Sequence, residues 1–127
     1  APYTLGLART PVDPADPFLY HKTTNRPVYE RARAERPDCA DTLLWNTRGE
    51  VTETCITNVL YRMEENLYTP PVDCGLLAGI YRNMLLKQGE IKERVLRVDE
   101  LSAVQEFRLV NSVRGSWAVE MRGDEGR

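Results

Sequence analysis

The sequence has little of what disulfide-rich and zinc proteins need. In 127 residues there are three cysteines, Cys39, Cys55 and Cys74, and His21 is the single histidine. No CxxC pair is present, so a zinc site built from cysteine and histidine is poorly supported. An odd number of widely spaced cysteines favours free thiols in a reducing cytoplasm, where we expect the protein to act.

Long apolar runs and an excess of one charge are also missing. No apolar run approaches the roughly 20 residues that a membrane-spanning helix needs. The formal net charge is −2, so no basic field favours nucleic acid or an anionic membrane as a partner. With 42% hydrophobic and 28% charged residues in 127, the composition is typical of one globular domain.

The chain begins with Ala1 rather than Met. Its first ten residues, APYTLGLART, lack the pattern of a charged segment followed by an apolar one that marks a signal peptide. We therefore expect the chain to be a processed or excised piece of a longer polypeptide.

The first half of the chain predicts one helix among strands. Residues 3–9 alternate as in a strand, and the prolines of 10–17 predict a loop. Asn25 as a cap and Pro27 in the first turn predict a helix that Pro37 ends. Strands are then predicted at 41–47, 50–56, 57–63 and 67–69, with Gly49 permitting a hairpin between the first two.

The second half continues this mixture. Residues 76–89 form an amphipathic pattern that predicts a helix ending at Gly89. Residues 91–98 alternate as in a strand, and Asp99 predicts the cap of a short helix before two final extended segments, 108–115 and 117–121. Strands that alternate with helices and hairpins indicate a mixed α/β domain.

Several polar residues and one glycine stand at places where chemistry is plausible, but each has an ordinary role. Lys22 precedes the predicted first helix, and such a lysine is most often a solvated charge. A glutamate in a strand, such as Glu53, usually faces solvent, and Asn58 is typical of a turn. Gly79 often only permits close packing. Asn111 and Ser112 resemble ordinary loop residues.

Taken together, residues 49–82, GEVTETCITNVLYRMEENLYTPPVDCGLLAGIYR, resemble the signature of the class IV pyridoxal-phosphate aminotransferase fold. The matching positions are Glu53, Cys55, Asn58, Val59, Leu67-Tyr68-Thr69 and Leu77-Ala78-Gly79-Ile80-Tyr81-Arg82. Leu60 stands where the family usually has an aromatic residue. The resemblance implies a mixed α+β fold with a barrel-like sheet and flanking helices. It also implies that residues 1–127 are the C-terminal, cofactor-binding domain of an enzyme like D-amino-acid aminotransferase.

The stretches FLYHKTTNRPVYE (18–30) and NSVRG (111–115) narrow the resemblance to the aminodeoxychorismate lyases. They are most similar to the lyase-like domain fused to aminodeoxychorismate synthase component I. This implies a lyase that releases pyruvate from 4-amino-4-deoxychorismate and leaves 4-aminobenzoate for folate synthesis. Two alternatives stay open: a class IV aminotransferase of branched-chain or D-amino acids, and a fused docking domain without catalysis.

The resemblance also implies a role for each candidate residue. Lys22 would be the catalytic residue that binds the aldehyde of pyridoxal 5'-phosphate covalently, which requires a neutral amine. The apolar run before it and the start of the following helix would both disfavour the ammonium form. Glu53 would keep the pyridine nitrogen protonated.

The phosphate of the cofactor would lie on the backbone N–H groups of Gly79, Ile80 and Tyr81, at the start of a helix. Asn111 and Ser112 occupy a later loop that approaches the phosphate in relatives. We expect Asn58 to shape the hairpin behind Glu53.

Class IV enzymes also carry a smaller N-terminal domain, which this sequence does not contain. We therefore expect the chain to be part of a longer polypeptide that binds a small-molecule substrate and forms a homodimer. As an isolated chain it is expected to bind the cofactor weakly and to turn over slowly or not at all.

Overall fold

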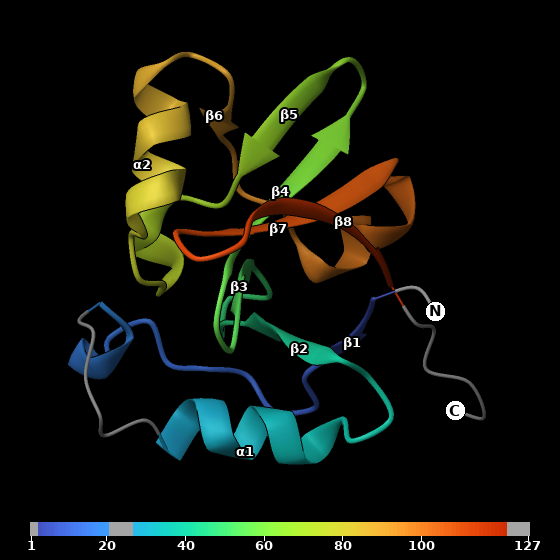
Figure 1. Cartoon of the computed structure of the whole chain (residues 1–127). Coiled ribbons are helices and arrows are strands. Elements are labelled where there is room, and N and C mark those ends of the chain that lie inside the picture. Colours follow the sequence, from blue (N-terminus) through green and yellow to red (C-terminus); the bar gives the residue numbers. More distant parts are fainter. Residues whose placement is uncertain (1–2, 21–26, 122–127) are drawn as a thin grey trace.

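The computed structural model describes residues 3–20 and 27–121. Its strands are β1 (Thr4–Leu7), β2 (Asp41–Trp45), β3 (Val51–Thr54), β4 (Asn58–Met63), β5 (Asn66–Thr69), β6 (Lys92–Glu93), β7 (Glu106–Asn111) and β8 (Gly115–Met121). They form one mixed sheet in the order β3-β2-β1-β8-β7-β4-β5-β6 (Figure 1). Strand β1 runs parallel to β2 and β8, while β4 runs antiparallel to β5 and β7.

One further pairing gives the sheet its shape. Glu53 of β3 lies opposite Asn58 of β4 in antiparallel register, although these strands stand far apart in the sheet order. This pairing closes β3, β2, β1, β8, β7 and β4 into a ring, and β5 and β6 extend beyond it. The predicted mixed fold with a barrel-like sheet is thereby confirmed.

The helices lie outside the ring. Helix α1 (Pro27–Glu35) covers β2, and α2 (Ile80–Lys87) covers the side of β4 and β7 (Figure 1). Three short 3-10 helices, η1 (Pro17–Leu19), η2 (Val72–Cys74) and η3 (Val98–Ala103), lie in the segments that connect these strands and helices. Among the described residues no helix is both long enough and apolar enough to cross a bilayer.

The alternation of side chains along each strand separates the core into an inner and two outer parts. Val59 and Tyr61 of β4 point into the ring, where they join Leu109 of β7. Between them Leu60 points outward and packs with Leu85 of α2. This period of two is the expected geometry of a strand with both faces covered. A third cluster lies under α1, where Tyr29, Ala32, Leu44 and Cys55 are buried together.

Helix α2 is shorter than the sequence predicts. Of the predicted helix 76–89, only Ile80–Lys87 is helical, and Gly79 is an extended N-cap with ψ at 155°. Both polar groups of the Leu77 backbone are bonded elsewhere, to the Glu53 carboxylate and to the Asn58 amide. These bonds compete with helix formation before Gly79. The predicted end is confirmed, since Gly89 follows the helix with φ at +76°.

Two predicted elements after α2 are wrong. The predicted strand 91–98 is reduced to β6, because Leu96 and Val98 bond to the β2–β3 hairpin instead. The predicted helix after Asp99 is the 3-10 helix η3, and Arg97 is its N-cap. The Glu100 carboxylate accepts the Arg97 backbone N–H at 2.9 Å and so fixes this earlier start.

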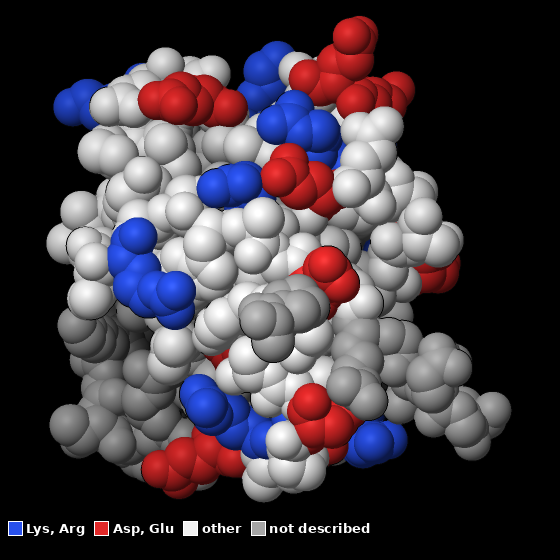
Figure 2. Space-filling model, turned by 45° about the vertical axis from the view of Figure 1, so that its right-hand side comes forward, with Lys and Arg blue, Asp and Glu red and all other residues white. Residues whose placement is uncertain are grey.

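Charges of both signs are interspersed over the molecule. Figure 2 shows basic and acidic side chains next to one another on one face. Arg108 and Arg62 both pair with Glu106, at 3.2 and 3.3 Å. Such half-exposed pairs contribute little to the free energy of unfolding. Cys39, Cys55 and Cys74 form no disulfide with one another, as predicted.

The burial of the ring interior can be tested by truncation. Leu109 is fully buried, with 0% of its surface exposed, while Val113 is 91% exposed. We expect Leu109→Ala to lower the free energy of unfolding by about 2–5 kcal/mol, because it leaves a cavity in the core. Val113→Ala should change it by less than about 0.5 kcal/mol. Urea denaturation followed by circular dichroism measures both, and equal small effects would contradict the assigned core.

Candidate functional site

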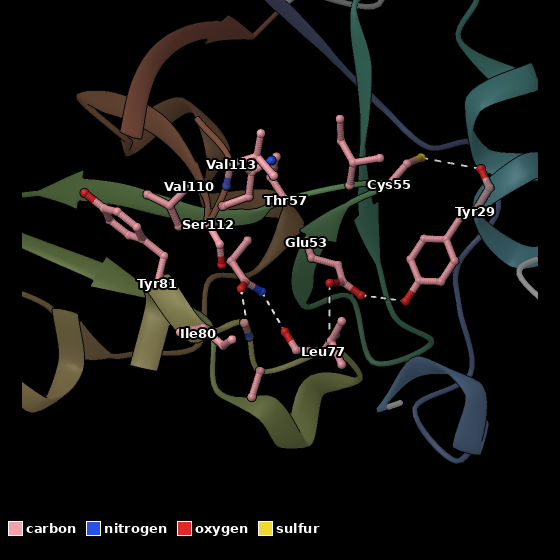
Figure 3. A pocket seen from close by; sticks show the side chains of 15 residues that line it. Tyr29, Glu53, Cys55, Thr57, Leu77, Ile80, Tyr81, Val110, Ser112 and Val113 are labelled. Carbon is pink, nitrogen blue, oxygen red and sulfur yellow. Dashed lines mark hydrogen bonds between the residues drawn. The ribbon is translucent and has the colours of Figure 1, made fainter. Parts of the chain in front are cut away.

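A cavity of about 380 Å³ lies where segments distant in the sequence meet. The end of β3, the start of α2 and the β7–β8 turn surround it, and α1 contributes one side chain (Figure 3). Its described lining residues are Tyr29, Glu53, Cys55–Asn58, Leu77–Tyr81 and Val110–Val113. The cavity thus gathers six of the seven residues that are predicted to bind the cofactor, all except Lys22.

Glu53 is buried at the wall of this cavity, with 5% of its surface exposed. Its Oε2 accepts a hydrogen bond from the Tyr29 hydroxyl at 2.7 Å, and its Oε1 accepts the Leu77 N–H at 3.4 Å. Among the lining residues that the structure describes, Glu53 carries the single formal charge. A carboxylate held in this way can pair with a protonated nitrogen of a ligand.

Asn58 fixes the chain just before α2. Its Nδ2 donates to the Leu77 carbonyl at 2.8 Å, and its Oδ1 accepts the Gly79 N–H at 3.1 Å. A Cβ on Gly79 would lie 2.5 Å from Oδ1, so a larger residue would displace the Asn58 amide or the chain. We expected Asn58 to shape the hairpin behind Glu53. It pairs with Glu53 between β3 and β4, and it also sets the start of α2.

The start of α2 presents backbone donors to the cavity wall. The bonds along the helix begin with the Asn83 N–H donating to the Gly79 carbonyl at 3.0 Å. The N–H groups of Ile80 and Tyr81 therefore have no acceptor earlier in the helix. Together with the helix dipole they can bind an anion. Figure 3 shows the Tyr81 ring pointing away from Glu53.

The β7–β8 turn forms a further part of the cavity wall. The Asn111 Oδ1 accepts the N–H groups of Val113 and Arg114, at 3.1 and 2.8 Å. This amide therefore builds the turn, and Gly115 completes it with φ at +79°. Ser112 lies at the tip of the same turn and lines the cavity. Asn111 therefore contributes to the cavity wall by fixing the shape of this turn.

Tyr29 and Cys55 are among the lining residues to which the sequence assigned no role in the site. Tyr29 comes from α1, and nothing in its local sequence marks it as part of a site. Cys55 was singled out only as a position of the signature, and its thiol donates to the Tyr29 carbonyl at 3.4 Å. Burial and the neighbouring Asp41 carboxylate raise the pKa of this thiol to about 12, so it stays protonated at neutral pH.

Lys22 and His21 lie outside the described residues, and so does Asn25, the predicted helix cap. The covalent role of Lys22 therefore stays a prediction. The binding roles assigned to the other six residues stay predictions as well, although the structure brings all six together.

Comparisons with known proteins agree with this geometry. The model of the family "Amino-transferase class IV" matches residues 2–121. A protein of Schizosaccharomyces pombe described as a candidate aminodeoxychorismate lyase is 37% identical over 122 residues, which cover 90% of this chain and 53% of that protein. The chain therefore spans about half the length of this relative.

Two solved structures are similar over almost the whole chain. A candidate amino-acid aminotransferase from Mesorhizobium loti superposes with a TM-score of 0.90 at 37% identity, covering 96% of this chain and 60% of that one. The 4-amino-4-deoxychorismate lyase of Pseudomonas aeruginosa gives a TM-score of 0.79 at 27% identity, covering 94% and 47%. With its fold, its signature and the family match in agreement, the chain belongs to the class IV aminotransferases, a family of enzymes.

Proposed function

We propose that this chain is the cofactor-binding part of a pyridoxal-phosphate enzyme that acts as a 4-amino-4-deoxychorismate lyase. Its products would be pyruvate and 4-aminobenzoate, a precursor for folate synthesis. The observation that carries the proposal is one cavity that contains both a buried carboxylate, Glu53, and the first backbone N–H groups of α2. The likeness to a fission-yeast relative and to a solved lyase supports the choice of reaction.

The described lining fits the cofactor in charge and in size. Glu53 suits a protonated pyridine nitrogen, and the start of α2 at Gly79, Ile80 and Tyr81 suits a phosphate. Asn111 shapes the turn that presents Ser112 as a further donor for that phosphate. A volume of about 380 Å³ lies within the range of small-molecule sites.

When bound, the cofactor supplies an electron sink for the charge that develops on the substrate. The task of Glu53 is to hold a proton at the ring nitrogen, and the Tyr29 hydroxyl and the Leu77 N–H fix its two oxygens for this task. Lys22, from its place in the sequence, would take the proton from the substrate carbon that bears the amino group. Loss of the enolpyruvyl ether as pyruvate then leaves an aromatic ring, which drives the reaction.

The whole enzyme would need more than this chain. We propose that a further domain, the smaller domain of the class IV fold, covers the mouth of the cavity, that the protein forms homodimers, and that it acts in the cytoplasm. What supports a covering partner is the exposure of three aliphatic side chains that line the cavity. Ile56, Ile80 and Val113 are 54%, 78% and 91% exposed. The expected fusion to a synthase component stays a prediction.

A second candidate function is amino transfer, because the Mesorhizobium loti structure of an amino-acid aminotransferase is as similar in sequence as the fission-yeast relative. Both reactions need the same carboxylate at the ring nitrogen. A docking domain without catalysis is less well supported, since it would not need a buried glutamate at a cavity wall.

Product analysis with the full-length protein separates these functions. With pyridoxal phosphate and 4-amino-4-deoxychorismate we expect equal amounts of pyruvate and 4-aminobenzoate. Glu53→Gln should slow their formation on the order of 100-fold or more, because an electrostatic stabiliser of the developing charge is lost. The exposed Glu65→Gln serves as a control and should keep the full rate.

Two other outcomes would change the proposed function. Formation of a keto acid, with the amino group passed to a second substrate, would assign the protein to the aminotransferases. Failure of the full-length protein to develop a cofactor absorbance band would favour the docking domain.

The phosphate site can be tested at Gly79. An added methyl group would lie 2.5 Å from the Asn58 Oδ1 and displace the chain at the start of α2. We expect Gly79→Ala to weaken binding of pyridoxal phosphate roughly tenfold, the loss expected when hydrogen bonds to a charged group are disturbed. Binding of pyridoxal, which has no phosphate, should change little. Absorbance titration measures both affinities.

Gly89→Ala provides the matched control at the other end of the same helix. There the added methyl group meets no atom within 4 Å, but the positive φ makes the substitution unfavourable. It should lower stability and leave both affinities unchanged. An equal loss for pyridoxal and its phosphate in Gly79→Ala would show that the start of α2 does not bind the phosphate.

A further inference from the structure

We propose that Tyr29 is a positioning residue for Glu53, whose carboxylate it holds in the orientation that a ring nitrogen requires. This inference rests on the proposed function, because it assumes that Glu53 pairs with the cofactor ring. It concerns a residue of α1 that the signature does not include. Tyr29 would act through Glu53.

The first observation is the hydrogen bond between the two side chains. The Tyr29 hydroxyl donates to the Glu53 Oε2 at 2.7 Å, and both residues are buried, with 8% and 5% of their surfaces exposed. The Leu77 N–H reaches the other oxygen at the longer distance of 3.4 Å. A short bond from a neutral hydroxyl stabilises the ionised carboxylate and restricts its rotation. Figure 3 shows the Tyr29 ring directed toward Glu53 across the side of the cavity.

The second observation is that Tyr29 is itself held by the same strand end. The Cys55 thiol donates to the Tyr29 carbonyl at 3.4 Å, and Cys55 follows Glu53 by two residues. The ring of Tyr29 also packs in the cluster under α1 with Leu44 and Ala32. With its backbone and its side chain both bonded to this end of β3, Tyr29 has little freedom to move away from the carboxylate.

The position of Tyr29 in the chain gives this contact a further consequence. Tyr29 follows Lys22 by seven residues and lies on the helix that begins at Pro27. Its bond to Glu53 therefore connects the helix that follows the predicted cofactor lysine with the strand that carries the predicted ring-nitrogen partner. A helix that is fixed against the strand carrying Glu53 limits motion at this side of the site.

The test compares Tyr29→Phe with the wild type in the full-length protein. Phenylalanine keeps the packing of the ring and removes only the hydroxyl. We expect the affinity for pyridoxal phosphate to fall roughly fivefold to tenfold, the effect of losing a hydrogen bond to a charged group. An analogue that has carbon in place of the ring nitrogen should bind equally well to both proteins, because it offers no proton to Glu53.

A double-mutant cycle shows whether Tyr29 acts through Glu53. In a Glu53→Gln background the effect of Tyr29→Phe should shrink to less than about twofold, because coupled residues are not additive. Tyr61→Phe is the matched control. It removes a buried hydroxyl that donates to the Arg94 carbonyl, on a strand residue that does not line the cavity. It should lower stability without changing cofactor affinity.

The outcomes separate this inference from the proposed function. If Glu53→Gln weakens cofactor binding and Tyr29→Phe does not, the positioning role of Tyr29 is wrong and the function stands. Equal weakening by Tyr29→Phe in both backgrounds, or for both cofactor forms, would assign Tyr29 to packing and overturn the inference. If Glu53→Gln leaves cofactor affinity unchanged, the proposed function fails and the inference fails with it.

Discussion

Where β3 meets β4, Glu53 lies opposite Asn58, and this pair of residues closes the ring of strands. The two side chains then bind the same short segment, since Glu53 accepts the Leu77 N–H while Asn58 bonds to the Leu77 carbonyl and the Gly79 N–H. Closure of the sheet, the course of residues 77–79 and the start of α2 therefore depend on one another. A change at either residue would alter the cavity wall at both its acidic part and its helical part.

This arrangement places opposite electrostatic features in one small space. A buried carboxylate is costly unless it is hydrogen-bonded and paired. Tyr29 and Leu77 offset part of that cost for Glu53, and a cationic group on a ligand would offset more. The start of α2 favours an anion by its dipole and its backbone donors, without a cationic side chain among the described lining residues. A ligand that is positive at one end and negative at the other satisfies both features.

The sequence predicted the parts of this site that depend on local spacing. Glu53 and Gly79 follow from their fixed positions in the signature, and Gly49 and Gly89 follow from turns that require positive φ. The start of α2 was wrong by four residues, because contacts of Leu77 with strand residues about 20 positions earlier prevent helix formation. Tyr29 was missed for the same reason, since its partner lies 24 residues later in the chain. Contacts over such distances leave no periodic pattern in the sequence.

The described cavity indicates a cofactor more clearly than it indicates a reaction. Glu53 and the start of α2 suit the ring and the phosphate, which lyases and aminotransferases of this fold share. Discrimination between substrates needs groups that contact the part of the substrate beyond the cofactor. The most exposed side chains that line the described cavity are Ile56, Ile80 and Val113, which are apolar. They can exclude water beneath a covering domain, but they offer no side-chain hydrogen bond to a substrate carboxylate. Under the proposed function, substrate selection would then depend on polar groups such as the Thr57 hydroxyl, on backbone donors of the β7–β8 turn, or on residues outside the described part of the chain.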